Sequence, residues 1–218
     1  MEILAVDTPR QTALNGVAKD RERERVEDLV TFRAFATGLA EAQSENVTLR
    51  AQGTRAAREA FTKIYLRYRE RVYAYSLRVL GNAEDAEDIF QEVFFRVYSR
   101  AQSFEEERSV GGWIFTIAHN LCMNKIRDRK PQEAIEDANL SVDPSAEMGE
   151  DWQTVIAEAI EALPIEYREV IVLREYQGMS YAEMTEILQT TVPAIKSRLY
   201  RAKGRLRELL APYYLPQS

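Results

Sequence analysis

Apolar residues recur every three or four positions over most of this chain, which is the period of an α-helix rather than of a β-strand. The pattern is clear near the C-terminus, where a short helix would have an apolar face made by Tyr181, Met184, Ile187 and Leu188. A longer helix follows, with an apolar face made by Ile195, Leu199, Ala202 and Leu206. Segments in which apolar and polar residues alternate are few. The pattern therefore predicts an all-α protein.

Residues typical of helix ends separate these two C-terminal helices. Gly178 ends the preceding helix, and Ser180 with Glu183 three positions later forms a capping box. The polar run 189–191 ends the short helix, and Pro193 falls in the first turn of the next one, where its missing N–H costs nothing. Two helices joined by a tight turn constitute a helix-turn-helix.

The second helix of this pair carries a strongly basic surface. Between positions 196 and 207 its polar faces hold six cations with no acidic residue among them, namely Lys196, Arg198, Arg201, Lys203, Arg205 and Arg207. The whole chain, by contrast, has a net charge of −6 and an isoelectric point of about 5.1. A short helix packed across a basic one presents that helix to the major groove of duplex DNA. The local reversal of charge therefore predicts a focused DNA-binding surface.

Composition excludes several classes of protein. The 218 residues are 45% hydrophobic and 29% charged, which is typical of a globular protein with one or two cores. A single Cys122 and a single His119 leave no internal disulfide, no zinc site of the usual kind and no His-based catalytic triad. Neither a membrane-spanning run nor a signal peptide is present, so we expect a cytoplasmic protein without a cofactor.

The chain divides into five stretches by composition. Between Pro131 and Asp151 there are seven acidic residues and no Lys or Arg, which predicts a self-repelling linker. The stretches are an N-terminal extension (1–53), a first helical domain (54–130), the acidic linker (131–151), a second helical domain with the helix-turn-helix (152–211) and a tail (212–218).

The N-terminal extension is predicted to contain one helix from about Asp20 to about Gln43. Its rough apolar stripe consists of Val26, Leu29, Val30, Phe35 and Leu39. Two interpretations stay open, a helix that packs on the first domain or frays, and an autoinhibitory or sensor segment that covers a functional surface.

A helix capped by Asn82 has two contrasting faces. One face is apolar and consists of Ile89, Phe90, Val93, Phe94 and Val97. The opposite face combines carboxylates with an aromatic ring and consists of Asp85, Asp88, Glu92 and Phe95. It is compatible with a solvated surface, with a docking surface for a basic partner, or with a carboxylate metal site, although the Glu-x-x-His pattern of helical metal proteins is absent.

The next helix is predicted from Trp113 to about Arg129, with Trp113 in the core. Asn120 lies along it, and its end is basic, with Lys125 and Arg127. Cations are favourable at any helix C-terminus, so a purely structural role is one interpretation. The other is that amides, aromatic rings and cations here bind unstacked single-stranded bases.

Several motifs, in this order and spacing, resemble those of bacterial RNA polymerase sigma factors of the extracytoplasmic-function (ECF) group of the sigma-70 family. They are the run 85–94 (DAEDIFQEVF), Trp113 with Ile117, Ala118 and Asn120, Leu163-Pro164 with Arg168, and the run 195–202 (IKSRLYRA). The resemblance covers about residues 57 to 210.

The resemblance implies a sigma region 2-like helical bundle and a sigma region 4-like helix-turn-helix, in a specificity subunit that is not an enzyme. It implies that the first domain docks on the clamp helices of the polymerase β′ subunit through Asp85, Asp88, Gln91, Glu92 and Phe95. It implies minus-ten recognition over about 103–129, with a base flipped out of the non-template strand. The candidate residues there are Asn120, Lys125 and Arg127. For the minus-thirty-five element the implied contacts are Lys196, Ser197, Arg198 and Arg201.

An anti-sigma factor is a further partner that is common in the family. Three positions depart from the family pattern. Gln189 replaces the usual Gly of the turn, so it must accept the turn conformation without glycine's freedom. Ala194 replaces a Thr that opens the reading helix, which removes a hydroxyl. Asn124 replaces an acidic residue.

Two other functions compete with a sigma factor. A helix-turn-helix regulator would bind duplex DNA without polymerase, and its first domain would be a sensor or dimeriser. A helical-bundle hydrolase or metal enzyme would need clustered His or other metal ligands, which the sequence lacks.

Overall fold

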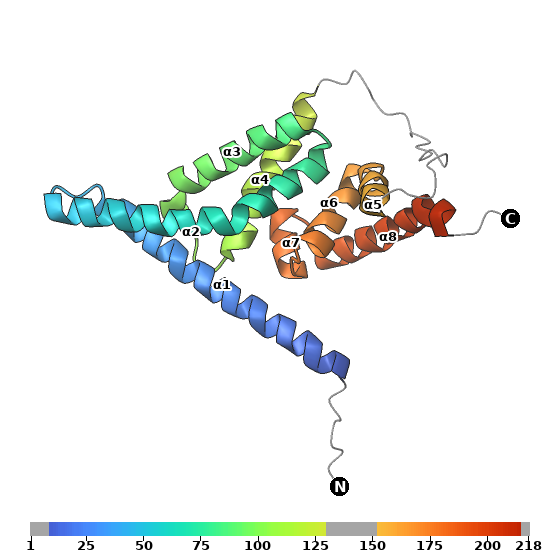
Figure 1. The fold of residues 1–218 in the computed structure, drawn as a ribbon, viewed down its shortest axis with the longest axis horizontal. Coiled ribbons are helices and arrows are strands. Elements are labelled where there is room, and N and C mark those ends of the chain that lie inside the picture. The colour runs from blue at the N-terminus through green and yellow to red at the C-terminus, as the bar shows by residue number, and fades with distance from the viewer. Residues whose placement is uncertain (1–8, 130–151, 215–218) are drawn as a thin grey trace, which may run out of the picture. The chain divides into compact units, whose positions relative to one another are not determined.

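The structure is a computed structural model that describes residues 9–129 and 152–214. Every regular element in these residues is helical, which confirms the predicted all-α class (Figure 1). The helices are α1 (Pro9–Glu41), α2 (Val47–Leu80), α3 (Ala83–Ser99), the 3₁₀ turn η1 (Ala101–Ser103), α4 (Val110–Asp128), α5 (Trp152–Glu161), α6 (Ile165–Ile171), the π-helical turn η2 (Val172–Tyr176), α7 (Tyr181–Ile187) and α8 (Val192–Tyr214). The predicted acidic linker, 131–151, lies outside the described residues.

By their contacts the residues form two compact units. Of the described residues, one unit contains 9–66 together with 99–111, and the other contains 67–98, 112–129 and 152–214. The predicted division at residue 53 falls inside α2, which runs without interruption from Val47 to Leu80. The five-stretch domain division stays a prediction.

The first unit is built around a close approach of α1 to the start of α2. A Cβ added to Gly38 would lie 2.6 Å from the backbone nitrogen of Ala57, and one added to Gly53 would lie 2.5 Å from the Cβ of Glu41. Only glycine fits where two helix backbones come so close. Asn46 caps α2, since its side-chain oxygen accepts the backbone N–H of Thr48 at 3.0 Å.

Aromatic rings complete the core of this unit. Phe32 and Phe35 of α1 are 1% and 0% exposed, and the Phe32 ring centroid lies 4.6 Å from that of Phe104, just after η1. The predicted stripe on α1 is wrong in part. Val26 and Val30 are exposed, whereas Phe32, outside that stripe, is buried because α1 contacts η1 on that side.

Arg33 and Glu106 form a bidentate ion pair beside this ring contact, with Arg33 Nε donating at 2.8 Å. The helix predicted from about Asp20 to about Gln43 is therefore present, begins earlier at Pro9, and packs on the segment after α3. A regulatory role for the extension stays a prediction.

In the second unit, glycine and asparagine form the sharp junction between α2 and α3. Gly81 has a φ of +66° and ends α2, and the Asn82 side-chain oxygen accepts the Asp85 N–H at 2.9 Å. The predicted apolar face of α3 is buried at Ile89, Val93, Phe94 and Val97 and half-buried at Phe90. Trp113 is buried, as predicted, but α4 begins three residues earlier, at Val110, so two consecutive glycines lie inside its first turn.

The helix-turn-helix is present as predicted. Ser180 and Glu183 make both halves of the capping box at the start of α7. Gln189 is the one non-glycine with positive φ among the described residues, at 47°, which confirms that it takes the conformation usually given to glycine. α8 packs on α5, α6 and α7, with Ile195, Leu199 and Ala202 buried. It extends to Tyr214, beyond the predicted domain end at residue 211.

Candidate binding surfaces

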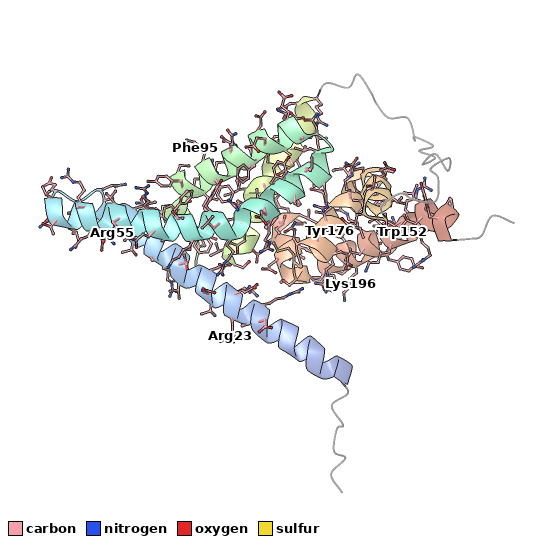
Figure 2. The ribbon with its side chains drawn as sticks, in the orientation of Figure 1. Arg23, Arg55, Phe95, Trp152, Tyr176 and Lys196 are labelled. Carbon is pink, nitrogen blue, oxygen red and sulfur yellow. The ribbon has the colours of Figure 1, made fainter. Side chains whose placement is uncertain are left out.

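The outer face of α3 exposes an aromatic ring among carboxylates (Figure 2). Phe95 is 67% exposed, although the opposite face of the same helix forms part of a core. Asp88 is also exposed, with 65% of its side chain in contact with solvent. Gln91 donates to Glu87 at 3.1 Å, and Glu92 pairs with Arg96 at 2.6 Å, so both are held along the helix. The face combines an apolar anchor with negative charge.

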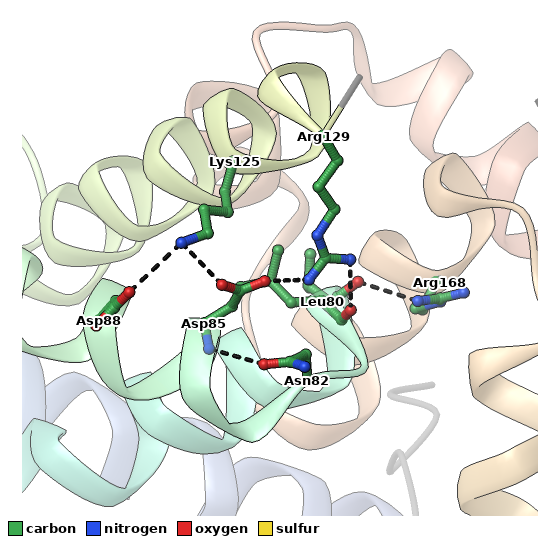
Figure 3. Close-up of polar contacts among 8 residues, drawn as sticks. Leu80, Asn82, Asp85, Asp88, Lys125, Arg129 and Arg168 are labelled. Carbon is green, nitrogen blue, oxygen red and sulfur yellow. Dashed lines mark hydrogen bonds and ion pairs between the residues drawn. The ribbon is translucent and has the colours of Figure 1, made fainter. Parts of the chain in front are cut away.

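Asp85, predicted to belong to this face, is turned toward α4 instead (Figure 3). Lys125 Nζ lies 2.8 Å from one carboxylate oxygen of Asp85, and the Arg129 guanidinium pairs with the other. Only 18% of the Asp85 side chain is exposed. Hydrogen bonds from Arg129 and then from Lys125 hold the pKa of the Asp85 carboxyl below its ordinary value.

The C-terminal end of α4 carries the residues predicted to contact the minus-ten element. Asn120 is exposed, and the Arg127 guanidinium donates to Asn124 at 3.0 Å and lies 3.8 Å from Asp128. Lys125, by contrast, is bound by Asp85 and lies 3.4 Å from Asp88, and the hydrogen bond with Asp85 raises the pKa of its ammonium. The structure thus brings together residues that the sequence assigned to two different partners.

The exposed face of α8 carries the residues predicted to contact duplex DNA. Lys196, Ser197 and Arg201 are exposed. Arg198 is less accessible, with 32% of its side chain exposed and its Nε 3.7 Å from Glu166. Thr191 has its hydroxyl 3.4 Å from the Ala194 N–H, so it caps the start of the helix. Figure 2 labels Lys196 on this helix.

Tyr200 is a residue of this surface that the sequence interpretation did not name. Tyr200 is 83% exposed and lies four residues after Lys196, on the same face of α8. The helical spacing contained this signal. Two other cations of α8 are paired within the unit, Lys203 with Glu175 at 2.8 Å and Arg205 with Glu208 at 2.9 Å.

A buried carboxylate in α6 joins it to helices α2 and α4. Glu169 is 5% exposed, accepts the Tyr75 hydroxyl at 3.3 Å, and lies 2.7 Å from Nδ1 of His119. Burial, and then the negative charge of Glu169, raise the pKa of Tyr75. The sequence did not predict this contact of His119, because its partner is 50 residues away along the chain.

Arginine side chains make two further contacts, one between α6 and the end of α2, and one between α2 and the residue after η2. Arg168 donates to the backbone carbonyl of Val79 at 3.0 Å, and burial lowers the pKa of its guanidinium. Arg71 donates to the carbonyl of Gln177 at 2.9 Å. Cys122 of α4 is fully buried, and this burial raises the pKa of its thiol to about 12.

Within the described residues no helix is long and apolar enough to cross a membrane. The same residues contain no group of three or more His, Cys, Asp or Glu side chains that could hold a metal ion.

Comparison with known proteins identifies the class. The family model described as "Sigma-70 region 2" matches residues 64–132, and "Sigma-70, region 4" matches residues 153–206. ECF RNA polymerase sigma factor SigW of Bacillus subtilis is 32% identical over 169 residues, which are 70% of this chain and 89% of that protein. SigE of Mycolicibacterium smegmatis is 31% identical over 175 residues, 75% of this chain and 66% of that protein.

Solved structures show the same fold. The sigma factor RpoE of Bartonella quintana, in complex with the anti-sigma factor NepR, matches with a TM-score of 0.58 and 27% identity over 69% of this chain and 96% of that one. CnrH, in complex with the cytosolic domain of CnrY, matches with a TM-score of 0.54 and 26% identity over 81% of this chain and 97% of that one.

These matches define a sigma factor built from regions 2 and 4. The chain belongs to the ECF group of the sigma-70 family. It therefore directs RNA polymerase to promoters and binds core polymerase and promoter DNA, as the sequence predicted, and the polymerase-independent regulator is not favoured.

Proposed function

We propose that this chain is a non-catalytic specificity subunit that acts in the cytoplasm and uses separate surfaces for polymerase and for each promoter element. The observation that carries the proposal is the opposite chemistry of two exposed helix faces. Part of α3, within the region 2 match, exposes Phe95 among carboxylates, and α8, within the region 4 match, exposes cations.

Core polymerase binds the outer face of α3 in this proposal. Phe95 is the apolar anchor, because burying an exposed aromatic ring at the centre of an interface contributes strongly to affinity. Asp88, Gln91 and Glu92 surround it and favour a basic partner surface. The β′ clamp helices are the partner that the family resemblance implies.

The promoter contacts lie on α4 and α8. Asn120, Lys125 and Arg127 contact the unpaired minus-ten strand, where amides and cations suit exposed bases and phosphates. Lys196, Ser197, Arg198 and Arg201 contact the minus-thirty-five duplex, some at base edges and others at phosphates. Ala194 at the start of the reading helix, and Gln189 in the turn before it, affect which sequence is preferred.

An anti-sigma factor is a further proposed partner. One of the similar solved structures is named as a complex with the anti-sigma factor NepR, and another is named as a complex with the cytosolic domain of CnrY. An inhibitor of this chain would compete with polymerase or DNA for the surfaces named above.

Reconstitution with core RNA polymerase tests the proposal. Full-length chain added to core enzyme should yield transcripts from a defined set of start sites, and mapping these start sites genome-wide should reveal one two-part promoter motif. Core enzyme without the chain is the control. Tight, sequence-specific binding of the chain to duplex DNA without polymerase would contradict the proposal and favour a regulator.

A further inference from the structure

The acidic residue predicted to contact polymerase and a cation predicted to contact DNA bind each other. Asp85 comes from α3 and Lys125 from α4, and their charged atoms are 2.8 Å apart. The second carboxylate oxygen of Asp85 is taken by the guanidinium of Arg129 (Figure 3). Both oxygens therefore interact with the end of α4.

Asp85 is much less accessible to solvent than Asp88, the other aspartate predicted for the same face. The Asp85 side chain is 18% exposed and the Asp88 side chain is 65% exposed. A partner protein that recruited Asp85 would have to displace two cations, whereas Asp88 is open to solvent and lies 3.4 Å from Lys125. Asp88 is thus the better docking carboxylate.

The surrounding helix ends explain why this cluster is stable. Asp85 lies in the first turn of α3, where its N–H bonds to Asn82 and a negative charge is favourable. Lys125 and Arg129 lie at the C-terminal end of α4, where a positive charge is favourable. Arg129 also donates to the carbonyl of Leu80 at 3.2 Å, at the end of α2. One cluster joins the ends of three helices.

We propose that Asp85 is a positioning residue, which fixes the last turn of α4 and holds Lys125 where it contacts the unpaired minus-ten strand. It acts through Lys125 and Arg129 and does not contact core polymerase. The inference rests on the proposed DNA contact of α4. It assigns opposite defects to two aspartates that lie three residues apart on one helix.

Two isosteric variants of the full-length chain provide a matched comparison. Asp85→Asn should keep the affinity for core polymerase within about twofold and lower promoter opening by about tenfold. Asp88→Asn should weaken core binding and lower opening by the assembled holoenzyme less than Asp85→Asn does, because Lys125 keeps its 2.8 Å contact with Asp85. Core affinity is measured by competition, and opening by permanganate reactivity of minus-ten thymines, both well below the unfolding temperature of each variant.

A double-mutant cycle separates positioning from a general loss of stability. Lys125→Met should lower opening, and the double variant should be no worse than the more defective single variant, because both changes disable the same contact. If Asp85 only stabilised the fold, Asp85→Asn would lower the unfolding midpoint, and its loss of promoter opening would add to that of Lys125→Met. Independent, additive defects, or a loss of core affinity in Asp85→Asn, would overturn the inference.

Limited proteolysis gives a readout that does not depend on transcription. Trypsin cleaves after Lys and Arg, and a regular helix end resists it. Asp85→Asn should speed cleavage at Lys125, Arg127 and Arg129, whereas Asp88→Asn should not, and equal rates would overturn the inference. Unchanged promoter opening by Lys125→Met would contradict the proposed DNA contact of Lys125 itself. Additive defects in the double-mutant cycle would instead contradict only the positioning role of Asp85.

Discussion

The basic residues of α8 differ in solvent exposure and in ion pairing, although the sequence alone shows them as one basic set. Arg201 is exposed, whereas Arg205 is paired with Glu208 at 2.9 Å and Arg198 is partly covered near Glu166. The exposed cations have more to contribute to DNA binding than the paired ones do.

Replacing Arg201 with Ala should weaken promoter binding by the holoenzyme by about 1–3 kcal/mol, the scale of one lost base or phosphate contact. Core affinity should not change. Arg205→Ala is the control and should alter binding by no more than about twofold. Titrations at several salt concentrations measure both effects, and equal losses for the two variants would contradict the assignment of the DNA-facing side.

Gln189 offers a test at the turn. A residue with a side chain is strained at a φ of 47°, so Gln189→Gly should stabilise the chain against unfolding by about 1 kcal/mol. The neighbouring Thr190 has no positive φ, so Thr190→Gly should destabilise it. Thermal unfolding of the full chain measures both. A lower midpoint for Gln189→Gly would show that the side chain stabilises the turn in another way.

At the scale of elements, the packing around a helical glycine determines whether a larger side chain can replace it. Gly38 of α1 meets the backbone of Ala57 in α2, whereas no atom lies within 4 Å of a Cβ added to Gly204 in α8. Both glycines lie within helices, where propensity alone favours alanine.

Gly38→Ala should therefore destabilise the chain by about 2 kcal/mol, because the backbones of α1 and α2 must move apart. Gly204→Ala should stabilise it by up to about 1 kcal/mol, since it adds helix propensity without a clash. Urea unfolding followed by circular dichroism compares the two. Stabilisation by both substitutions would mean that α1 does not approach α2 this closely in solution.

At the scale of the whole molecule, buried polar contacts connect the helices of the region 2 match with those of the region 4 match. Glu169 of α6 reaches Tyr75 of α2 and His119 of α4, and Arg168 reaches the end of α2. The sequence suggested two bodies connected only through a linker. The structure adds direct contacts between them, which any movement toward two separate promoter elements would have to break.

Glu169→Ala should cost about 3 kcal/mol of unfolding free energy, because it leaves the hydroxyl of buried Tyr75 and the half-buried ring of His119 without this acceptor. Glu169→Gln keeps an acceptor oxygen and should cost less. Hydrogen exchange should speed up in α4 and α6 together in the Ala variant. Faster exchange in α6 alone would show that the two regions do not depend on this contact.

Much of this protein follows from local sequence. The period of apolar residues predicts helices, and Gly81, Asn82, Ser180 and Glu183 mark their ends, because caps and turns depend on residues within a few positions of one another. The strained turn at Gln189 was predictable for the same reason. The ordered motifs, which are also local, were sufficient to indicate the family.

Only the tertiary structure decided which charged residues are available to partners. Helical spacing places Asp85 and Asp88 on one face of α3, but it does not show which other helix packs beside that face. The pairing of Asp85 with Lys125 and Arg129 could therefore not be predicted. The same holds for Glu169 with His119, and for Phe32 with Phe104. Charge and periodicity are properties of the chain, whereas burial and ion pairing depend on distances between segments that are remote in sequence.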